Sequence, residues 1–388
     1  MKPLPLMKKI KVLHISPDSV IHGTERHILA LVEYSNRDIV ENTVVTPRKG
    51  VMNDELDRLN VKNFIAGRKH GYKGKFRGVL SNDSRSLFRL IKEGGYDIVH
   101  THLNSFGGFI GKLAGTKYAV HTRHGVFWSE EELEHISAPD KFFQLFKSKV
   151  FDRTVAIGNY EKQTLIEKFK YPESKIIRTI NGVNIDKILS GTNSAKSKLD
   201  IFGTNDIIAG STGRLERQKG FHFIIEAANI LKNKTPRLKF FIIGSGKEKE
   251  NLEKLIDEYG LRDKVFLYDY KQNILDYVKC FDMMLSTSLW EGLSYSVQEA
   301  MALGKPVISF TAPHVSGVKE IIEDGVSGFL VDYKDSNALA GKIYELFSND
   351  ELRINFGKAA QEKIRNCFPE WQTAKDMDKL YIELMISN

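Results

Sequence analysis

The sequence has few cysteines and no long apolar run. Its 388 residues include only two cysteines, Cys280 and Cys367, which give no sign of a disulfide framework or a metal cluster. A reducing compartment is therefore expected. No stretch reaches the roughly 18 apolar residues of a membrane-spanning helix. Residues 1–17 also lack the apolar core of a signal peptide, so we expect neither secretion by that route nor a membrane-spanning chain.

The composition is that of an ordinary globular protein, but its charge is unevenly distributed. Hydrophobic residues make up 41% and charged residues 27% of a chain long enough for two domains. Residues 1–190 carry ten more basic than acidic residues, whereas the remainder carries two more acidic than basic ones. The first half is therefore the part that would meet an anionic partner.

Most of this positive charge is concentrated in one stretch, Lys62–Lys92. It holds nine basic residues and one acid, Asp83, together with Phe64, Tyr72 and Phe76. Such a cluster could contact anionic phospholipid or a pyrophosphate-linked acceptor, or it could be a solvated loop and helix face. No recognised nucleic-acid motif accompanies the charge, so we expect no nucleic-acid partner.

Short apolar runs alternate with amphipathic helical stretches along the whole chain. The expected strands are 9–16, 42–46, 97–102, 118–122, 154–157 and 175–180, then 207–211, 239–243, 264–267, 282–286, 306–310 and 328–331. Buried strands separated by helices predict parallel sheets covered by helices. Two such sheets in series predict two Rossmann-like domains, each binding ligands at the carboxyl ends of its strands. Residues 190–205, rich in Ser, Gly, Asn and Thr, read as the linker.

The most informative segment is 285–307, which places Glu291 and Glu299 across a strand end, a tight loop and a helix. Gly292 allows a close turn, and Ser294 and Ser296 are candidate caps. The helix N-terminus would suit a phosphate group. If the segment is mostly helical, the two acids lie about 12 Å apart along its axis. Glycosidase carboxylate pairs lie about 5–9.5 Å apart, so a two-carboxylate hydrolase is disfavoured.

This segment resembles the Glu-seven-residues-Glu signature of family 4 glycosyltransferases, which are retaining GT-B enzymes that use nucleotide-sugar donors. The resemblance implies an α/β GT-B fold, with two Rossmann-like domains facing across a cleft. It implies an N-terminal acceptor-binding domain, 1–187, and a C-terminal donor-binding domain, 188–368. A terminal helix, 369–388, would return to the N-terminal domain.

The resemblance also assigns roles to residues of this segment. Glu291 would face the donor sugar, and Glu299 would accept hydrogen bonds from ribose hydroxyls. The backbone N–H groups of Gly292 and Leu293 would point toward the sugar-phosphate. The alternative is a surface Glu and a helix Glu flanking an ordinary turn.

Two cations follow the first strand of the second half, at Arg214 and Lys219. Fixed cations there would neutralise a diphosphate leaving group and ease cleavage of the anomeric bond. The pattern is similar to the family's Gly-Arg and Lys-Gly element, with Gly213 and Gly220 completing it. The alternative is a pair of ordinary surface cations.

Gly244 and Gly246 follow the next strand and open a helix. They suggest a dinucleotide fingerprint, but Lys249 occupies the third glycine position, so NAD is weakly supported. By resemblance, Gly244 lines the nucleotide pocket; alternatively, the two glycines only make a tight strand–helix turn.

The first half contributes two further candidates. The family often has two glycines after its first strand, whereas this chain has His22-Gly23, so only Gly23 is carried over, as a donor-binding residue. His124, followed by Gly125, is similar to the family's inter-domain histidine at the donor sugar, where an imidazole can donate a hydrogen bond. His14, His100 and His102 also end strands; we interpret them as structural, with His102 a candidate for acceptor binding.

Taken together, the resemblance implies a retaining glycosyltransferase with His124, Glu291, Arg214 and Lys219 as catalytic residues. It would move a hexose or N-acetylhexosamine from a nucleoside-diphosphate sugar, UDP favoured over GDP, to a hydroxyl of a glycan or lipid-linked acceptor. That reaction would serve cell-surface polysaccharide or glycolipid synthesis. The alternatives are a sugar-nucleotide epimerase or phosphorylase of similar shape and a non-catalytic nucleotide-binding module.

No metal or other cofactor is expected, since the one Asp-any-Asp motif, Asp376 to Asp378, lies in the terminal helix rather than after a strand. We expect a cytoplasmic protein with peripheral contact at the inner face of an anionic membrane, through its basic N-terminal half.

Overall fold

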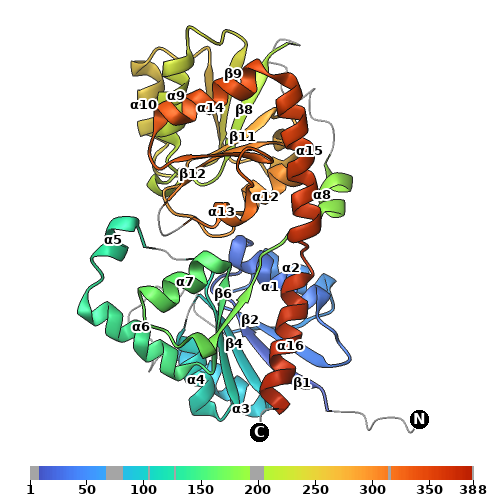
Figure 1. Ribbon diagram of the computed structural model, residues 1–388. Helices are drawn as coiled ribbons and strands as arrows, with labels where there is room; N and C mark the ends of the chain where they lie inside the picture. Colours follow the sequence, from blue (N-terminus) through green and yellow to red (C-terminus); the bar gives the residue numbers. More distant parts are fainter. Residues whose placement is uncertain are drawn as a thin grey trace. The chain divides into compact units, whose positions relative to one another are not determined.

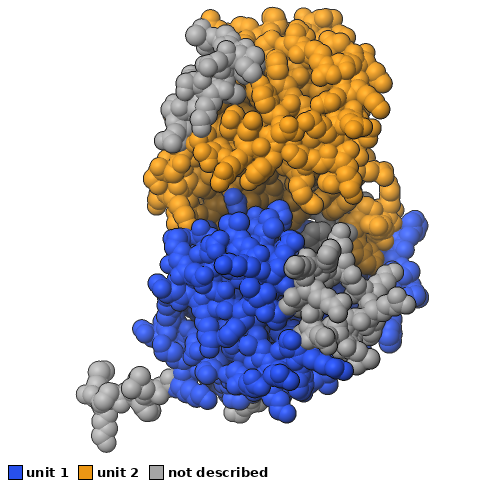
Figure 2. Space-filling model, turned by 180° about the vertical axis from the view of Figure 1, so that it is seen from behind, with its two compact units in different colours: residues 1–125, 135–181, 370–388 blue, residues 126–134, 182–369 orange. Residues whose placement is uncertain are grey.

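The computed structural model describes residues 8–66, 82–103, 105–125, 128–192, 205–312 and 316–386. Two compact units share the chain (Figure 2). Unit 1 comprises residues 1–125, 135–181 and 370–388, and unit 2 comprises residues 126–134 and 182–369. The described part of the linker predicted at 190–205 is 190–192 and 205, and residues 193–204 lie outside the described residues.

Unit 1 is built on a seven-stranded parallel sheet in the order β3-β2-β1-β4-β5-β6-β7 (Figure 1). Its strands are β1 (Ile10–Ile15), β2 (Val40–Thr46), β3 (Lys62–Ile65), β4 (Ile98–His102), β5 (Tyr118–Thr122), β6 (Arg153–Ile157) and β7 (Ile176–Thr179). Its helices are α1 (Gly23–Tyr34), α2 (Val51–Arg58), α3 (Asn82–Gly94), α4 (Phe106–Ala114), α6 (Ala138–Val150), α7 (Asn159–Glu167) and α16 (Gln372–Ile386), with a short 3-10 turn, η1 (Glu173–Lys175).

The terminal helix α16 completes the core of unit 1. Met377, Leu380, Tyr381 and Leu384 are buried against β1, β2 and α1 residues such as Val12 and Leu31. Asp378 accepts hydrogen bonds from Ser35 Oγ and the Asn36 backbone N–H, both at 2.7 Å. The predicted return of the last helix to the N-terminal domain is confirmed.

Unit 2 is built on a six-stranded parallel sheet in the order β10-β9-β8-β11-β12-β13. Its strands are β8 (Ile207–Thr212), β9 (Leu238–Ile243), β10 (Val265–Tyr268), β11 (Met283–Ser286), β12 (Val307–Thr311) and β13 (Gly328–Asp332). Its helices are α5 (Glu130–Glu134), α8 (Ile185–Gly191), α9 (Phe221–Leu231), α10 (Lys249–Glu258), α11 (Ile274–Val278), α12 (Tyr295–Ala302), α13 (Val318–Ile321), α14 (Ser336–Ser348) and α15 (Asp350–Cys367), with a 3-10 turn, η3 (Arg217–Lys219).

Both sheets reverse their strand order once, which is the arrangement of doubly wound nucleotide-binding folds. The reversal lies between β1 and β4 in unit 1 and between β8 and β11 in unit 2. The central strands are buried because helices cover both faces of a parallel sheet. The expected α/β fold, with two Rossmann-like units, is confirmed.

The sequence analysis missed one strand. β3 pairs with β2 at the edge of the sheet, inside the basic stretch 62–92. Its residues are exposed or half-buried, so it lacks the apolar run that marked the other strands. Arg68, Lys69, Lys73, Lys75 and Arg77 of that basic stretch lie outside the described residues.

Candidate active site

The point in unit 2 where the strand order reverses brings together the loops that follow β8 and β11. These two strands are neighbours in the sheet, with Met283 opposite Ala209 and Met284 opposite Gly210. Because both strands are parallel, their carboxyl ends lie at the same edge. The loop after β8 carries Lys219, and the loop after β11 carries Glu291, so the adjacency of the two strands explains why these side chains lie close together.

Lys219 and Glu291 form an ion pair between Lys219 Nζ and Glu291 Oε2. Ser288 Oγ donates a second hydrogen bond to the same oxygen, at 3.1 Å. The Lys219 side chain is 16% exposed and that of Glu291 21% exposed, so the pair is partly shielded from water but reachable. The predicted cation and the predicted acid therefore belong to one cluster.

The backbones of the two loops are tied together. Thr287 Oγ1 donates to the Lys219 carbonyl at 2.9 Å, and the Leu289 N–H donates to the Gln218 carbonyl at 2.7 Å. Gly220 has φ +60°, and a Cβ on it would lie 2.3 Å from the Thr287 carbonyl oxygen. A glycine is needed at 220 both for the left-handed backbone and for the approach of the next loop.

Gly244 brings the turn after β9 into the same region. A Cβ there would lie 1.8 Å from the Gly213 carbonyl oxygen, so the β9 turn and the β8 loop touch backbone to backbone. Arg214, next to Gly213, is exposed. The loop between β8 and α9 therefore holds one half-buried cation, Lys219, and two exposed cations, Arg214 and Arg217.

Helix α12 begins after Ser294, and the acid-bearing loop packs against the segment before α13. The Gly317 N–H donates to the Glu291 carbonyl at 3.1 Å. Ser294 stands at the cap position, but its hydroxyl pairs with Ser296 Oγ at 3.1 Å rather than with the helix backbone. Glu299 lies within α12 and is 8% exposed.

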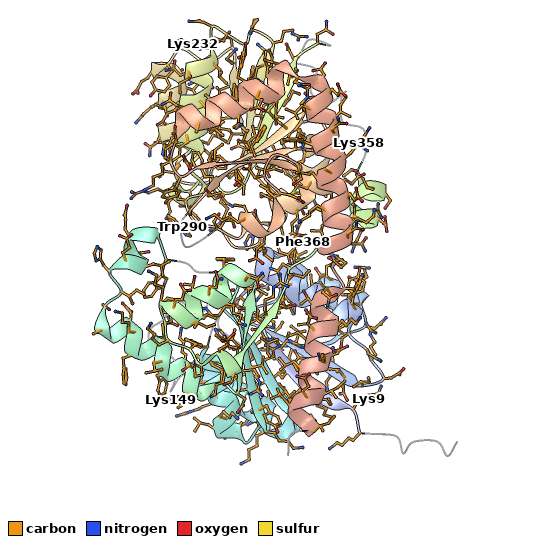
Figure 3. The ribbon with its side chains drawn as sticks, viewed as in Figure 1. Lys9, Lys149, Lys232, Trp290, Lys358 and Phe368 are labelled. Carbon is orange, nitrogen blue, oxygen red and sulfur yellow. The ribbon has the colours of Figure 1, made fainter. Side chains whose placement is uncertain are left out.

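The remaining donor-binding candidates of unit 2, Gly292 and Leu293, lie in this loop. Gly292 is half-buried and Leu293 is 4% exposed. Trp290, labelled in Figure 3, accepts a hydrogen bond from Gln218 Nε2 to its carbonyl at 2.7 Å, which ties the loop to η3. Unit 2 thus gathers Arg214, Lys219, Gly244, Glu291, Gly292 and Leu293 at one edge of its sheet.

In unit 1, His124 follows β5, and the next residue, Gly125, is anchored to a buried acid. The Gly125 N–H donates to Glu161 Oε1 at 3.2 Å, and Glu161 is fully buried. The second oxygen of Glu161 accepts from the Ile157 N–H at 2.8 Å. Burial raises the pKa of Glu161, and nearby Arg123 opposes that shift. Glu161 thus links the backbone after His124 to the end of β6. The sequence analysis missed this contact, since a lone acid at a helix start has no distinctive pattern.

His124 also belongs to a cluster of buried imidazoles. His14 Nδ1 lies 3.3 Å from His102 Nε2, and His102 Nδ1 lies 3.2 Å from His124 Nε2. His27 packs edge-on against His124 with ring centroids 4.7 Å apart, and its Nδ1 contacts Asn181 Oδ1 at 2.6 Å. Burial lowers the pKa of His14 and His27 to about 4 and those of His102 and His124 well below the usual value.

Two triads within this cluster have nitrogens close enough to share a metal ion. They are His14, His100 and His102, and His27, His102 and His124, with ligand atoms within 4.8 Å of one another. His27 was missed by the sequence analysis because it lies inside α1 rather than at a strand end. Several of these nitrogens already have hydrogen-bond partners, and the expectation of a metal-free enzyme stays a prediction.

Gly23, the N-terminal donor-binding candidate, is the first residue of α1 and is exposed. The preceding His22 N–H donates to Glu25 Oε2 at 3.0 Å, which closes the start of the helix. Asp376 and Asp378 of the Asp-any-Asp motif both accept hydrogen bonds within unit 1, Asp376 from Thr179 Oγ1 at 2.7 Å.

Family models match both halves of the chain. The model described as Glycosyltransferase Family 4 matches residues 21–187, and the model described as Glycosyl transferases group 1 matches residues 195–363. The chain belongs to the family 4 glycosyltransferases. The resemblance inferred from the Glu291 segment is thus confirmed.

Two curated glycosyltransferases illustrate the range of relatives. The UDP-Gal:alpha-D-GlcNAc-diphosphoundecaprenol alpha-1,3-galactosyltransferase of Escherichia coli is 25% identical over 387 residues, covering 98% of each chain. The poly(ribitol-phosphate) alpha-N-acetylglucosaminyltransferase of Staphylococcus aureus is 30% identical over 222 residues, covering 55% of this chain and 44% of that one.

Solved glycosyltransferase structures share the fold. HepE of Anabaena, crystallised with UDP, has a TM-score of 0.79 at 19% identity, covering 97% of this chain and 100% of that one. A glycosyltransferase of Rickettsia africae has a TM-score of 0.78 at 22% identity, covering 98% and 100%. The GT-B fold of this glycosyltransferase is therefore established.

Proposed function

We propose that this glycosyltransferase transfers a hexose or N-acetylhexosamine from a UDP-sugar to a hydroxyl of a glycan or lipid-linked acceptor, with retention of anomeric configuration. The observation that carries the proposal is the Lys219–Glu291 pair at the strand-order reversal of unit 2. The names of relatives support the choice of donor and acceptor. One relative uses UDP-Gal and a diphosphoundecaprenol acceptor, and HepE was crystallised with UDP and with UDP-glucose.

In this proposal Lys219 and Arg214 bind the diphosphate. Two cations would stabilise the negative charge that develops as the anomeric bond breaks. Arg214 is exposed and free to swing toward a ligand, whereas Lys219 would exchange its contact with Glu291 for a phosphate oxygen. The backbone N–H groups of Gly292 and Leu293 are proposed to bind the sugar-phosphate, and Gly244 and Gly23 to let the backbone approach the donor.

The two acids are proposed to bind hydroxyls rather than to attack the sugar. Glu291 would accept hydrogen bonds from the donor sugar, and Glu299 from the ribose. The leaving phosphate would take the proton of the attacking acceptor hydroxyl, so that neither acid forms a covalent intermediate. His124 would contact the donor sugar near the reacting centre. No metal ion is needed in this scheme, because cations of the chain offset the leaving charge.

A cytoplasmic enzyme acting at an anionic membrane completes the proposal. Within the described residues, no helix is both long and apolar enough to cross a membrane. A lipid-linked acceptor would then be reached by peripheral contact, in keeping with the excess of basic residues in the first 190.

A thermal-shift panel with UDP, GDP, ADP and NAD, each with and without Mg²⁺, tests the donor assignment. Ligand at a hundred times its dissociation constant stabilises by about 2.7 kcal/mol, which is worth a few degrees for a protein of this size. A metal-independent shift with UDP, followed by transfer from a UDP-sugar, is the expected result. UDP binding without transfer to any glycan or lipid-linked hydroxyl would favour a non-catalytic module, and a shift only with NAD would refute the proposal.

A further inference from the structure

Helix α6 has the reverse of the usual arrangement of side chains. Its buried residues are polar: Gln144, which accepts a hydrogen bond from Arg123 Nη1 at 2.9 Å, and Ser148. Four of its exposed residues are large and apolar: Phe142 is 73%, Phe143 39%, Leu145 39% and Phe146 42% exposed. A surface helix normally buries its apolar side and exposes its polar one. The polar contacts inside unit 1 account for the buried side of α6. On its other side Lys147 lies over the Phe143 ring, while Phe142 and Phe146 stay exposed.

Helices α4 and α3 continue this aromatic surface. Lys112 of α4 pairs with Asp152, just beyond α6, at 2.6 Å, and a Cβ on Gly108 of α4 would meet the Phe151 ring. On its outer side α4 exposes Phe109 at 36% and Leu113 at 61%.

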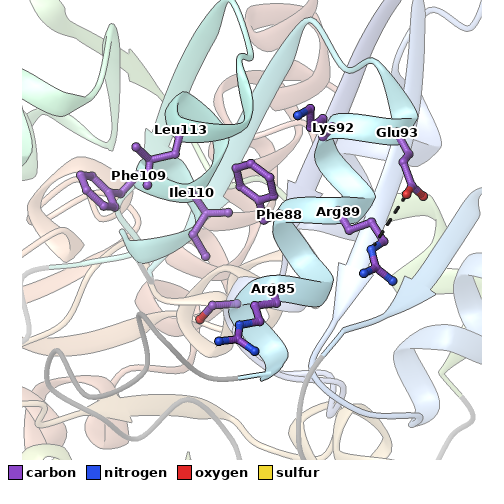
Figure 4. A pocket seen from close by; sticks show the side chains of 9 residues that line it. Arg85, Phe88, Arg89, Lys92, Glu93, Phe109, Ile110 and Leu113 are labelled. Carbon is purple, nitrogen blue, oxygen red and sulfur yellow. Dashed lines mark ion pairs between the residues drawn. The ribbon is translucent and has the colours of Figure 1, made fainter.

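Between α4 and α3 lies an open groove of about 680 Å³. Phe88 of α3 and Ile110 of α4 face each other across it, and Arg85 and Arg89 lie along its α3 side (Figure 4). The groove therefore combines an apolar floor with a basic rim. We call the outer surface of α3, α4 and α6 the aromatic-basic face.

The charge around these apolar side chains is mainly positive. The exposed cations are Lys141 and Lys149 on α6 and Arg85, Arg89 and Lys92 on α3, whereas Lys147 of α6 is half-buried. Lys149 stands at the end of α6 in Figure 3, and Lys147 Nζ lies 4.6 Å from the Phe143 ring centroid. The acids among the described side chains of α3 and α6 are engaged: Glu93 pairs with Arg89 at 4.0 Å, and Asp140 accepts from Ser137 Oγ at 2.5 Å. A second copy of this chain would present the same positive charge, so an anionic occupant is favoured.

We propose that the aromatic-basic face binds an anionic membrane surface. The phenylalanines of α6 enter the boundary between headgroups and acyl chains, while the lysines and arginines contact lipid phosphates. Lys and Arg reach such phosphates with extended apolar stems beside the aromatic rings. The proposal rests on the proposed function, which includes peripheral contact with an anionic membrane, and it assigns that contact to named residues.

Vesicle flotation of the full chain tests the proposal. The vesicles are phosphatidylcholine alone or mixed with phosphatidylglycerol. The test variant is Phe142→Ser/Phe146→Ser, and the matched control is Tyr344→Ser/Ile354→Ser, at exposed positions of unit 2. The wild type and the control should float with the anionic vesicles and be released by high salt. The test variant should lose about tenfold in partition coefficient, because two exposed aromatic side chains no longer insert.

Three outcomes would overturn the proposal. The first is a wild type that does not float with anionic vesicles. The second is a test variant that floats as well as the control. The third is a test variant that loses a dimer seen by light scattering, which would make the face a contact between copies. UDP thermal shifts recorded on the same proteins report on unit 2, so failure of membrane binding is separable from failure of the donor assignment.

An independent observation concerns the hydrogen-bond direction in the histidine cluster. Asn42 Oδ1 only accepts, so His14 Nε2–H donates to it at 2.9 Å. In a neutral ring His14 Nδ1 must then accept, and it does so from His102 Nε2–H at 3.3 Å. His102 Nδ1 accepts in turn from His124 Nε2–H at 3.2 Å. His124 Nδ1 is left buried and, among the described residues, without a hydrogen-bond partner.

We infer that Asn42, acting through His14 and His102, holds His124 in the Nε2–H tautomer. The Nε2–H that could donate to a sugar is committed to His102, and the nitrogen left without a partner is the buried Nδ1 acceptor. Any hydrogen bond between His124 and a sugar or acceptor hydroxyl would therefore be one that Nδ1 accepts once the ligand reaches it. Asn42, His14 and His102 are positioning residues, and the inference rests on the proposed function only for the identity of that hydroxyl.

Long-range ¹H–¹⁵N spectra of ¹⁵N-histidine-labelled full chain test this inference. His124→Gln identifies the His124 signals. The wild type and Asn42→Asp, which keeps an acceptor, should both show an unprotonated His124 Nδ1. Asn42→Leu removes the acceptor at a half-buried position and should give a mixture of His124 tautomers. A wild-type His124 protonated on Nδ1 would overturn the inference, as would an unchanged spectrum in Asn42→Leu. Stoichiometric zinc binding by His27, His102 and His124 would also overturn it.

Discussion

The Lys219–Glu291 pair allows a quantitative prediction, because it is a partly buried ion pair and, in the proposed function, both of its residues contact the donor. Exposed ion pairs contribute about 0.2–1 kcal/mol, and breaking a fully buried one costs about 3–5 kcal/mol. With side chains 16% and 21% exposed, this pair lies between those limits. We expect a coupling energy of about 1–3 kcal/mol from the cycle of Lys219→Met, Glu291→Gln and the double variant. Ser288 Oγ can still donate to a glutamine at 291, so Glu291→Gln should be the milder single variant.

Both single variants should fold but lose transfer. Each should lower the melting temperature by about 2–4 °C per kcal/mol lost. Because each removes a group proposed to contact the donor in the transition state, each should lower kcat by about 10²–10³. The control cycle is Lys342→Met with Glu345→Gln, an exposed pair at 2.9 Å whose coupling should be about 0.5 kcal/mol or less. Wild-type activity in either single variant would refute the site assignment, and equal coupling in the two cycles would refute the argument from burial.

Two further predictions concern backbone geometry and pH. Gly220→Ala should destabilise more than Gly260→Ala, since both have φ near +60° but only at 220 would the Cβ meet a carbonyl oxygen, that of Thr287 at 2.3 Å. Gly260→Ala should cost about 1 kcal/mol and keep activity, and equal losses in urea unfolding would contradict this reasoning. The free energy of unfolding should fall as the pH drops below about 6.5. In the unfolded chain His14 and His27 have the ordinary histidine pKa and bind a proton there, whereas in the folded protein burial lowers their pKa to about 4. The loss should approach about 1.4 kcal/mol per pH unit for each of these histidines, and His14→Gln should reduce that slope in denaturant titrations; a flat profile would show that they are not buried as neutral rings.

The sheets could be predicted from the sequence because their strands are apolar runs of ordinary length. The exception was β3, whose exposed and basic residues conceal an edge strand that forms only by pairing with β2. An edge strand is specified by its neighbour more than by its own side chains. The α/β class and the order of elements follow from local patterns, whereas this pairing is a tertiary effect.

The candidate site could be predicted only where a motif marked it. Lys219 and Glu291 were found separately by resemblance, and the fold explains their contact through the adjacency of β8 and β11. Glu161 and His27 have no motif, since their roles come from burial and from partners far along the chain. The sequence analysis interpreted the strand-end histidines one by one and so missed that His14, His102 and His124 contact one another in series. That contact depends on the pairing of β1 with β4 and of β4 with β5, which is tertiary structure.

The return of α16 to unit 1 affects the order in which the protein can form during synthesis. The ribosome must make all of residues 182–369 between the last strand of unit 1 and α16. At about 5–20 residues per second, this takes on the order of 10–40 s. During that interval the groove that Tyr381 and Leu384 will fill is open, and His100 lacks the Tyr381 hydroxyl that contacts its Nδ1 at 2.5 Å. The second unit can therefore complete its core before the first. Until α16 packs against it, the nascent N-terminal half exposes the apolar residues that α16 will cover, and we expect chaperones to bind there.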